Sequence, residues 1–257
     1  MSKSFITNLR KLSRKKHRHE KKQFVAEGVR AVRQIMLNKQ VIIDYLIFDE
    51  DGEAGKDPAI LEFKDAVNIN KVSRKEFLEL SDTDNPQGVL AVCRMPEPVD
   101  LASLNHQQGC LVALNRIQDP GNAGTILRTA AWFGAKGLLC DEGTVDLFHP
   151  KVVRSTAGAM GSFGWWQGNL ESALTELETS GWKTFLLDAG ERSANLKEID
   201  YGPKNILVIG NEAAGLDQAL IKSHRTMIKI PGADGNGAVE SLNASVALSV
   251  ALYEINR

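Results

Sequence analysis

Glycines near the end of the chain raise the first chemical question. Gly232 and Gly237 have the spacing of a phosphate-binding P-loop, but Ala238 and Val239 follow where that motif needs Lys and then Ser or Thr. Without that lysine and hydroxyl, the loop lacks the groups that reach phosphates and magnesium. The sequence therefore excludes a conventional triphosphate site and leaves open what this loop holds.

Arg128 is a charged residue in an apolar segment, TILRTAAWFGA, which follows the turn Asp119-Pro120-Gly121-Asn122. We expect a helix to begin at about Ala123, with Asn122 as its N-cap and Arg128 about one and a half turns into it. A buried arginine must be paired or must face a ligand. A structural ion pair and a ligand contact are therefore both open at this position.

A second polar loop follows the apolar run ILVIG. It contains Gly210, Asn211 and Glu212, and the chain turns again at Gly215. Glycines at a strand end let a bulky ligand approach the main chain closely. Glu212 could be a fixed acceptor for Arg128 or for a substrate hydroxyl, and it could equally be an exposed helix cap.

A third polar group stands at the entrance of the last expected helix. Ser241 and Asn243 precede a run of small and apolar residues, and Ser241 taken alone would be the N-cap. Small side chains let this helix pack closely on another backbone, and they are Ala244, Ser245, Ala247 and Ala251.

The three loops are positioned by an alternation of strands and helices. Near-continuous apolar strands that alternate with helices predict an α/β fold with a largely parallel sheet, and ligands lie beyond the carboxyl ends of such strands. We expect a small α/β domain over 1–95, a Pro-containing linker over 96–108 and the larger α/β domain over 109–257. The expected strands are 23–28, 43–50, 66–69, 88–93, 110–115, 137–140, 182–189, 205–210 and 227–231, and the expected helices are 29–40, 73–80, 125–135, 150–160, 170–181, 216–223 and 241–255.

Charge is distributed unevenly along the chain. The first 40 residues contain 12 Lys/Arg and 2 Asp/Glu, whereas the remaining 217 contain 19 and 30. Arg10, Arg14 and Arg18 recur every four residues, which on a helix would form one basic stripe able to neutralise a phosphate backbone. Because the excess is confined to one end, we favour nucleic-acid contact over the alternative of a solvated, frayed terminus.

Composition narrows the class of protein. With 257 residues, 43% of them hydrophobic, the chain can form one large or two modest domains. No apolar run approaches the roughly 20 residues that span a bilayer, and no signal-peptide core follows the lysine-rich start, so we expect a cytoplasmic protein. Cys93, Cys110 and Cys140 are far apart and form no CxxC pair, which predicts buried thiols rather than a disulfide framework or a zinc site.

The three polar loops, in this order, resemble the three motifs of the SpoU family of S-adenosylmethionine-dependent RNA ribose 2′-O-methyltransferases, part of the SPOUT superfamily. DPGNAGTILRTA is similar to the first motif, LVIGNEAAGL to the second, and IPG with VESLNASVAL to the third. VVRSTAGAM looks like the family's recurrent Ser-Ala-Gly-Ala segment. The resemblance covers about residues 109–257, and FVAEGVRAVRQIM more faintly resembles the start of a small substrate-binding domain that many relatives carry.

This resemblance implies a parallel sheet whose C-terminal chain forms a deep trefoil knot, and it implies a homodimer. The glycine loop would surround the adenosine part of S-adenosylmethionine, so no lysine is needed. Eight residues, GADGNGAV, separate Pro231 from Glu240, which is a longer loop than in most relatives. The cofactor contacts that the resemblance implies are Leu187, Asp188, Ala189, Ile209, Gly210, Asn211, Gly215, Ile230, Pro231, Leu242 and Ala247.

The resemblance also assigns roles at the reacting centre. Arg128 would lie at the ribose hydroxyl and its adjoining phosphate; because a guanidinium rarely loses its proton, we expect it to orient the phosphate and stabilise developing negative charge. Asn122, Glu212, Ser241 and Asn243 would orient the reactants, without a metal ion. The expected RNA contacts are Arg10, Arg14, Lys15, Lys16, Arg18, Lys21 and Lys22.

The family chemistry points to RNA, because the accepting group is the 2′-hydroxyl that DNA lacks. Ribosomal RNA is the first expectation and transfer RNA the alternative. A catalytically inactive RNA-binding assembly factor is a different class that stays open, since a fold does not fix a function. A dinucleotide-dependent oxidoreductase is disfavoured because no GxGxxG follows the first strand of the larger domain.

Overall fold

The computed structural model describes residues 3–62, 67–232 and 241–257, and it divides the chain into two compact units. The first unit contains the chain up to Pro96 together with Asp146–Ser162, and the second contains Glu97–Val145 and Phe163–Arg257. The insertion of Asp146–Ser162 into the first unit is not indicated by the sequence.

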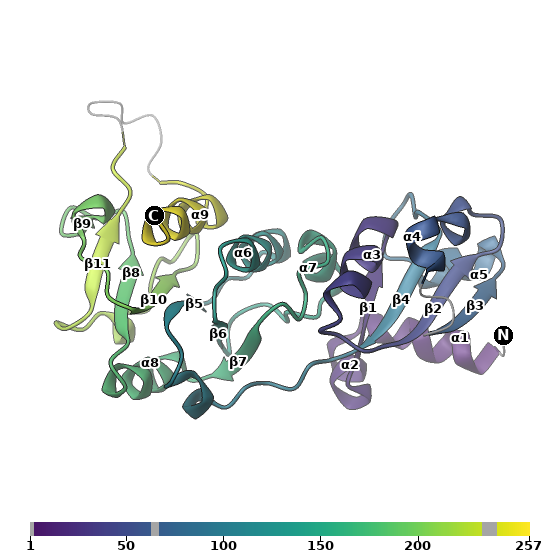
Figure 1. Cartoon of the computed structure of the whole chain (residues 1–257), viewed down its shortest axis with the longest axis horizontal. Coiled ribbons are helices and arrows are strands. Elements are labelled where there is room, and N and C mark those ends of the chain that lie inside the picture. Colours follow the sequence, from purple (N-terminus) through teal and green to yellow (C-terminus); the bar gives the residue numbers. More distant parts are fainter. Residues whose placement is uncertain (1–2, 63–66, 233–240) are drawn as a thin grey trace. The chain divides into compact units, whose positions relative to one another are not determined.

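The first unit is built on a four-stranded sheet (Figure 1) with the order β1-β4-β2-β3. Strands β1 and β2 pair antiparallel with β4, while β2 and β3 are parallel. The elements of this unit are α1 (Lys3–Arg10), η1 (Lys11–Ser13), α2 (Lys15–Lys21), β1 (Gln23–Glu27), α3 (Val29–Asn38), β2 (Ile43–Asp49), η2 (Glu53–Lys56), α4 (Pro58–Leu61), β3 (Asn68–Val72), α5 (Arg74–Leu80), β4 (Val89–Arg94) and α7 (Pro150–Ser155).

The basic N-terminal segment is part of this unit's core. Ile6, Leu9 and Leu12 are buried in a cluster with Phe77 of α5 and apolar residues of β2, β3 and β4. The three apolar side chains recur every three residues, which brings them to one face of α1 and η1. The alternative of a frayed terminus is therefore wrong for this segment.

Arg18 is the polar counterpart of that packing. Its side chain is 1% exposed and pairs with Asp146 from the inserted segment. Its guanidinium also donates to the carbonyl oxygens of Leu12 and Ser13, at 2.8 and 2.7 Å. A buried cation needs such partners. Arg18 thus fixes the inserted segment and the N-terminal turn to each other.

The second unit contains a seven-stranded sheet with the order β7-β6-β5-β10-β8-β11-β9, in which each strand pairs parallel with its neighbours. Figure 1 shows α6 and α9 together on one side of this sheet and α8 on the other. This confirms the parallel α/β sheet. The elements are η3 (Leu101–Leu104), β5 (Gly109–Leu114), α6 (Pro120–Trp132), β6 (Gly137–Asp141), β7 (Gly164–Gly168), α8 (Leu170–Thr179), β8 (Lys183–Leu187), β9 (Ala194–Asn195), η4 (Leu196–Glu198), β10 (Lys204–Ile209), η5 (Gln218–Leu220), β11 (Thr226–Lys229) and α9 (Ala244–Ile255).

Several expected elements differ from the observed ones. The helix expected over 216–223 is only the short turn η5, and the helix expected over 150–160 ends at Ser155. Strands β7 and β9 were not expected. Ala157 and Gly158 both have positive φ, which a helix excludes, so the chain turns after α7.

The three cysteines are buried in the two sheets. Cys93 lies in β4, Cys110 in β5 and Cys140 in β6, and all three are free thiols. Burial raises the pKa of each, that of Cys110 to about 12. Such thiols stay protonated, and the expectation that all three are buried is confirmed. Within the described part of the chain, no helix is both long and apolar enough to cross a bilayer.

Candidate active site at the carboxyl edge of the parallel sheet

The first functional loop begins where β5 ends and α6 starts. The N-cap of α6 is Asp119, whose side chain accepts a hydrogen bond from the backbone nitrogen of Asn122 at 2.7 Å, and Pro120 occupies the first turn. The expectation that Asn122 caps a helix beginning at Ala123 is therefore wrong. Because Asp119 satisfies the helix end, the amide side chain of Asn122 can bind other loops.

Asn122 joins the three functional loops. Its Nδ2 donates to Oε1 of Glu212 in the loop after β10, and its Oδ1 accepts from Nδ2 of Asn243 at 3.0 Å. An amide carries both a donor and an acceptor, so it can connect a carboxylate to a second amide. Residues 122, 212 and 243, which are far apart in the sequence, thus form one hydrogen-bonded chain.

Asn243, and not Ser241, is the N-cap of α9. Its Oδ1 accepts from the backbone nitrogens of Ser245 and Val246, at 2.9 and 3.4 Å, and from the hydroxyl of Ser245 at 2.7 Å. The Asn243 side chain therefore caps α9 with its oxygen and binds Asn122 with its nitrogen. Ser241 is exposed, and no hydrogen bond joins it to this chain in the part of the protein that the structure describes.

Arg128 is exposed on α6, so the expectation that it is buried is wrong. Among residues 3–62, 67–232 and 241–257, no hydrogen bond or ion pair engages its guanidinium. The alternative of a structural ion pair thus finds no partner in the described residues. An exposed cation without such a partner is free to bind an anion from solution.

The loop that carries Glu212 is held in a tight turn. Asn211 and Gly215 form an isolated antiparallel bridge, and Oδ1 of Asn211 accepts from the backbone nitrogens of Ala213 and Ala214, both at 2.9 Å. A Cβ at Gly210 would lie 2.6 Å from the carbonyl oxygen of Gly215. Gly210 is therefore required by the turn itself. The reason inferred from the sequence was a different one, the close approach of a ligand to the main chain.

A polar network missed by the sequence analysis supports these loops. Asn115, directly after β5, donates to both Asp141 and Asp217 at 3.0 Å, and it accepts from the backbone nitrogen of Asp217 at 2.8 Å. Arg116 pairs with Asp217 at 2.7 Å. Polar residues directly after apolar strands were the available signal for this network.

The network has an electrostatic consequence for both of its charged ends. The hydrogen bonds from Asn115 and then Arg116 lower the pKa of Asp217, and the hydrogen bond to Asp217 raises the pKa of Arg116. Both groups therefore stay charged near neutral pH, and the attraction between them links the loop after β5 to the loop after β10.

The expected cofactor contacts gather at the ends of neighbouring strands. Ile209 of β10 pairs with Leu187 of β8, which in turn pairs with Ile228 of β11, so these three strands finish side by side. The side chain of Leu242 is 49% exposed beside the start of α9. The remaining expected contacts lie in the same strand-end turns or on α9: Asp188, Ala189, Gly210, Asn211, Gly215, Ile230, Pro231 and Ala247.

These residues fit an adenosine-containing cofactor. Leu187 and Ile209 end their strands beside turn main chain, and the exposed Leu242 adds apolar surface before α9. Apolar side chains with a few polar contacts are the usual lining for a planar base. The carboxylate of Asp188 is already bound by the backbone nitrogen of Gly190 and the hydroxyl of Ser193, at 2.8 and 3.2 Å. Residues 233–240 of the glycine loop lie outside the described residues, and no group of metal-ligating side chains occurs in the part that was described.

The basic residues of the first unit do not form one helical stripe. Helix α1 ends at Arg10, and Arg14 is extended, with φ −97° and ψ 131°, so the chain bends before α2. Arg18 faces inward, and its assignment as an RNA contact is wrong because it is buried against Asp146. Arg10, Arg14, Lys15, Lys16, Lys21 and Lys22 remain exposed.

Comparisons with known proteins agree with this architecture. The model of the SpoU rRNA Methylase family matches residues 109–253, and that of the MRM3-like substrate binding domain matches residues 3–91. The chain is 30% identical over 250 residues to the 23S rRNA (guanosine(2553)-2′-O)-methyltransferase RlmP of Bacillus subtilis, covering 97% of this chain and 95% of the relative.

Two solved structures cover nearly the whole chain. An AdoMet-bound rRNA methyltransferase from Sinorhizobium meliloti is 28% identical, with a TM-score of 0.83 over 98% of this chain and 94% of that one. The SpoU methyltransferase AviRb from Streptomyces viridochromogenes, in complex with AdoMet, is 24% identical with a TM-score of 0.84, over 99% and 97%, and shows the fold alone. Because the family model matches more than half of the chain, and the Bacillus relative is similar over nearly its whole length, the protein belongs to the SpoU rRNA methylase family.

Proposed function

We propose that this protein transfers a methyl group from S-adenosylmethionine to a ribose 2′-hydroxyl of ribosomal RNA. The hydrogen-bonded chain of Asn122, Glu212 and Asn243 carries the proposal, because it unites the three loops whose motifs match the family. Ribosomal RNA is favoured over transfer RNA because the Bacillus subtilis relative, similar over almost the entire length of both chains, is a 23S rRNA 2′-O-methyltransferase.

The cofactor supplies a methyl group already activated on a sulfonium, so the protein has to align the accepting oxygen and help it to lose its proton. Alignment of two reactants can contribute roughly 7–11 kcal/mol without a metal ion. Leu187, Ile209 and Leu242 would hold the cofactor beside the polar chain. Glu212, fixed through Asn122, can accept a hydrogen bond from a ribose hydroxyl.

Arg128 would bind the phosphate next to the reacting ribose. Its guanidinium has no ion-pair partner within the described part of the chain. A fixed positive charge beside the hydroxyl favours the negative charge that develops on the oxygen during transfer. Arg128 therefore acts by position and charge rather than as a base.

Replacing Arg128 with Ala tests this role. We expect cofactor binding, followed by calorimetry, to change by less than about threefold, while methyl transfer to deproteinised ribosomal RNA falls by at least about 100-fold. Lys136→Ala is the matched control, because Lys136 is exposed just before β6, at the opposite edge of the sheet. Turnover of Arg128→Ala within a few-fold of the wild type contradicts the role.

The same calorimetry separates the enzyme from an inactive assembly factor. An enzyme binds S-adenosylmethionine with measurable heat, and a binding protein that has lost activity does not. Wild-type protein that gives neither heat nor methyl transfer would refute the proposed function. RNA binding by the first unit is a separate claim, which affinity measurements test independently.

The first unit would bind the RNA through its exposed cations. Removal of residues 1–22 is not a clean test, because it deletes the buried Ile6, Leu9 and Leu12. We instead expect the triple substitution of Arg14, Lys15 and Lys21 to Glu to weaken RNA binding and to flatten its salt dependence. The same triple change at Arg30, Arg33 and Lys39, exposed cations of the same unit, is the control. Equal salt slopes for the two triples contradict the assignment.

We further propose that the enzyme is a cytoplasmic homodimer. Helix α9 presents Val246, Val250 and Tyr253, at spacings of four and three residues that put them on one face, and these side chains are 48%, 38% and 61% exposed. Tyr253 contacts Phe133 edge to face, beside the highly exposed Trp132 at the end of α6. Apolar surface of this kind supports a subunit interface. The trefoil knot stays a prediction.

A further inference from the structure

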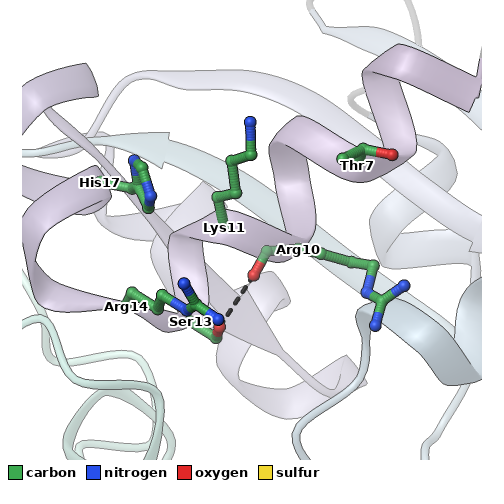
Figure 2. Close-up of a pocket in the computed structure, with 6 residues that line it drawn as sticks. All are labelled: Thr7, Arg10, Lys11, Ser13, Arg14 and His17. Carbon is green, nitrogen blue, oxygen red and sulfur yellow. Dashed lines mark hydrogen bonds between the residues drawn. The ribbon is translucent and has the colours of Figure 1, made fainter.

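Two neighbouring hollows of the first unit share Arg10 and Ser13. The first has a volume of about 300 Å³ and lies along α1, η1 and the start of α2 (Figure 2). The second has a volume of about 240 Å³ and lies between η1, β1, the end of α5 and the start of α7. The residues that line the first are Thr7, Arg10, Lys11, Ser13, Arg14 and His17.

The first hollow has the chemistry of an anion site. Three of its six lining residues are Arg or Lys, and none is acidic. Figure 2 shows Lys11, Arg14 and His17 gathered around η1, with Arg10 extending away from them. The Arg14 guanidinium makes no hydrogen bond or ion pair with any described residue, and the Lys11 amine donates to the neutral amide oxygen of Asn8, at 3.4 Å. The positive charges of Arg14 and Lys11 are therefore available to a phosphate.

The second hollow combines apolar walls with acceptor groups. Leu9, Leu12, Val25, Leu80 and Pro150 supply the apolar lining. A volume near 240 Å³ lies below the roughly 300–1,000 Å³ of pockets for drug-sized ligands, so the hollow suits a small fragment such as a single nucleobase.

Two carboxylates beside this lining each keep one oxygen free. Glu79 pairs with Arg10 through Oε2 at 3.2 Å, and Asp82 pairs with Arg154 through Oδ2 at 3.4 Å. Within the described chain, Oε1 of Glu79 and Oδ1 of Asp82 make no hydrogen bond. A free carboxylate oxygen can accept a hydrogen bond from the exocyclic amino group of a base.

In contrast, both carboxylate oxygens of Glu27, in the same hollow, already accept hydrogen bonds. Its Oε1 accepts from the hydroxyls of Ser81 and Thr83, and its Oε2 accepts from the backbone nitrogen of Asp82 at 3.0 Å. Glu27 therefore stabilises the turn after α5, and Glu79 and Asp82 are the two groups with capacity for a ligand.

We infer that the two hollows hold one unpaired nucleotide of the substrate RNA, with its phosphate in the first and its base, carrying an amino group, in the second. The inference rests on the proposed function, which supplies RNA as the ligand. Phosphate and base of one nucleotide are joined through a single sugar, as the two hollows are joined through Arg10 and Ser13. Only an unpaired base can offer its edge to such a hollow. The first unit thus selects an RNA loop rather than a duplex.

The test measures binding of short single strands to the full chain by fluorescence anisotropy, without cofactor. Three probes of equal length are used: oligocytidylate, whose bases carry an amino group; oligouridylate, whose bases do not; and an abasic ribose-phosphate strand. We expect the wild type to bind oligocytidylate at least about fivefold more tightly than oligouridylate, the lower end of discrimination by a good base contact, and the abasic strand least.

Two variants separate the hollows. Arg14→Ala should weaken all three probes by a similar factor and reduce the salt slope by about one, with Arg30→Ala as the control of equal charge. Asp82→Ala should abolish the preference for cytosine over uracil, while Asp84→Ala, an exposed carboxylate of the same loop outside the lining, should keep it. The backbone nitrogen of Asp82 still binds Glu27 in the alanine variant, so the turn is preserved.

Equal affinity of the wild type for the three probes would overturn the base site, and equal effects of Asp82→Ala and Asp84→Ala would do the same. Binding of acidic peptide but of no RNA probe would identify a protein ligand instead. Failure here is distinct from failure of the proposed function, because methyl transfer to ribosomal RNA by the wild type is scored separately and does not require the base preference.

Discussion

Asn122 is the residue on which the candidate site is centred. Its amide nitrogen is directed at a carboxylate, Glu212, and its amide oxygen at the amide of Asn243. The direction of each hydrogen bond is fixed because a carboxylate can only accept. Glu212 is thereby oriented by a residue of another loop, and any change that reverses the donor at position 122 should disturb all three loops.

Asn122→Asp tests this directionality. The variant places two carboxylates against each other at neutral pH, so Glu212 loses its donor and is repelled. We expect methyl transfer to fall by about tenfold or more, because the loss of a hydrogen bond to a charged group costs on the order of 1.5–3 kcal/mol. Cofactor affinity, measured by calorimetry, should fall much less.

A compensating change gives the control for that prediction. In Asn122→Asp with Glu212→Gln, the glutamine amide can donate to the new carboxylate, which restores a hydrogen bond with its direction reversed. We expect the double variant to recover part of the activity lost by Asn122→Asp. A double variant less active than either single variant would show that Glu212 is needed as a carboxylate, and that orientation alone does not explain the site.

Among the elements, the turn between β10 and η5 depends on two glycines for its shape. A Cβ added at Gly210 would lie 2.6 to 2.8 Å from backbone atoms of Gly215 and Leu216. A Cβ added at Gly215 would meet no atom within 4 Å, but the backbone there has a φ of +69°. The two glycines are therefore required for different reasons: the first for space, and the second for a left-handed backbone.

The two requirements predict different outcomes for alanine substitution. Gly210→Ala forces main-chain movement and should destabilise the second unit by about 1–3 kcal/mol, together with a loss of cofactor affinity. Gly215→Ala should cost about 1–2 kcal/mol from the left-handed conformation, and Gly215→Asn should cost less because asparagine tolerates it better. Thermal unfolding with and without cofactor measures both effects. Equal behaviour of the alanine and asparagine variants at position 215 would contradict the backbone argument.

At the scale of the whole molecule, the chain forms two units that are interleaved in sequence. The segment Asp146–Ser162 leaves the second unit after β6, packs within the first, and returns to form β7. Asp146 holds Arg18, and the Asn38 side chain donates to the carbonyl oxygen of Gly158 at 3.0 Å. The first unit therefore needs residues from the middle of the chain to complete it.

The proposed subunit interface is tested by a charge on its apolar face. Val250→Glu would place a carboxylate in the contact, and an unpaired buried charge opposes association. We expect light scattering to give twice 28.1 kDa for the wild type and 28.1 kDa for the variant. Ile221→Glu, an exposed apolar residue in the loop after η5, should leave the mass unchanged. A wild-type mass of 28.1 kDa at all concentrations would rule out the dimer.

The sequence by itself determined what depends on local pattern. Apolar runs alternating with helical periodicity predict the parallel sheet, and polar residues at strand ends predict the position of the site, because both follow from neighbours in the chain. Asn122, Glu212 and Asn243 were identified in this way, together with the motif resemblance. The helix start was misplaced because Asp119, three residues before Asn122, takes the capping position, and local propensity does not decide between two good caps.

Tertiary structure alone decided which charges are free and which are paired. Arg18 and Arg128 both look like candidate ligand contacts in the sequence, yet Arg18 is buried against Asp146, 128 residues away, and Arg128 is exposed. The roles of Gly210, Asn115 and Asp217 likewise depend on segments distant in the chain. Pairing of a charge depends on what long-range packing brings beside it, and that information is absent from the periodicity of any single segment.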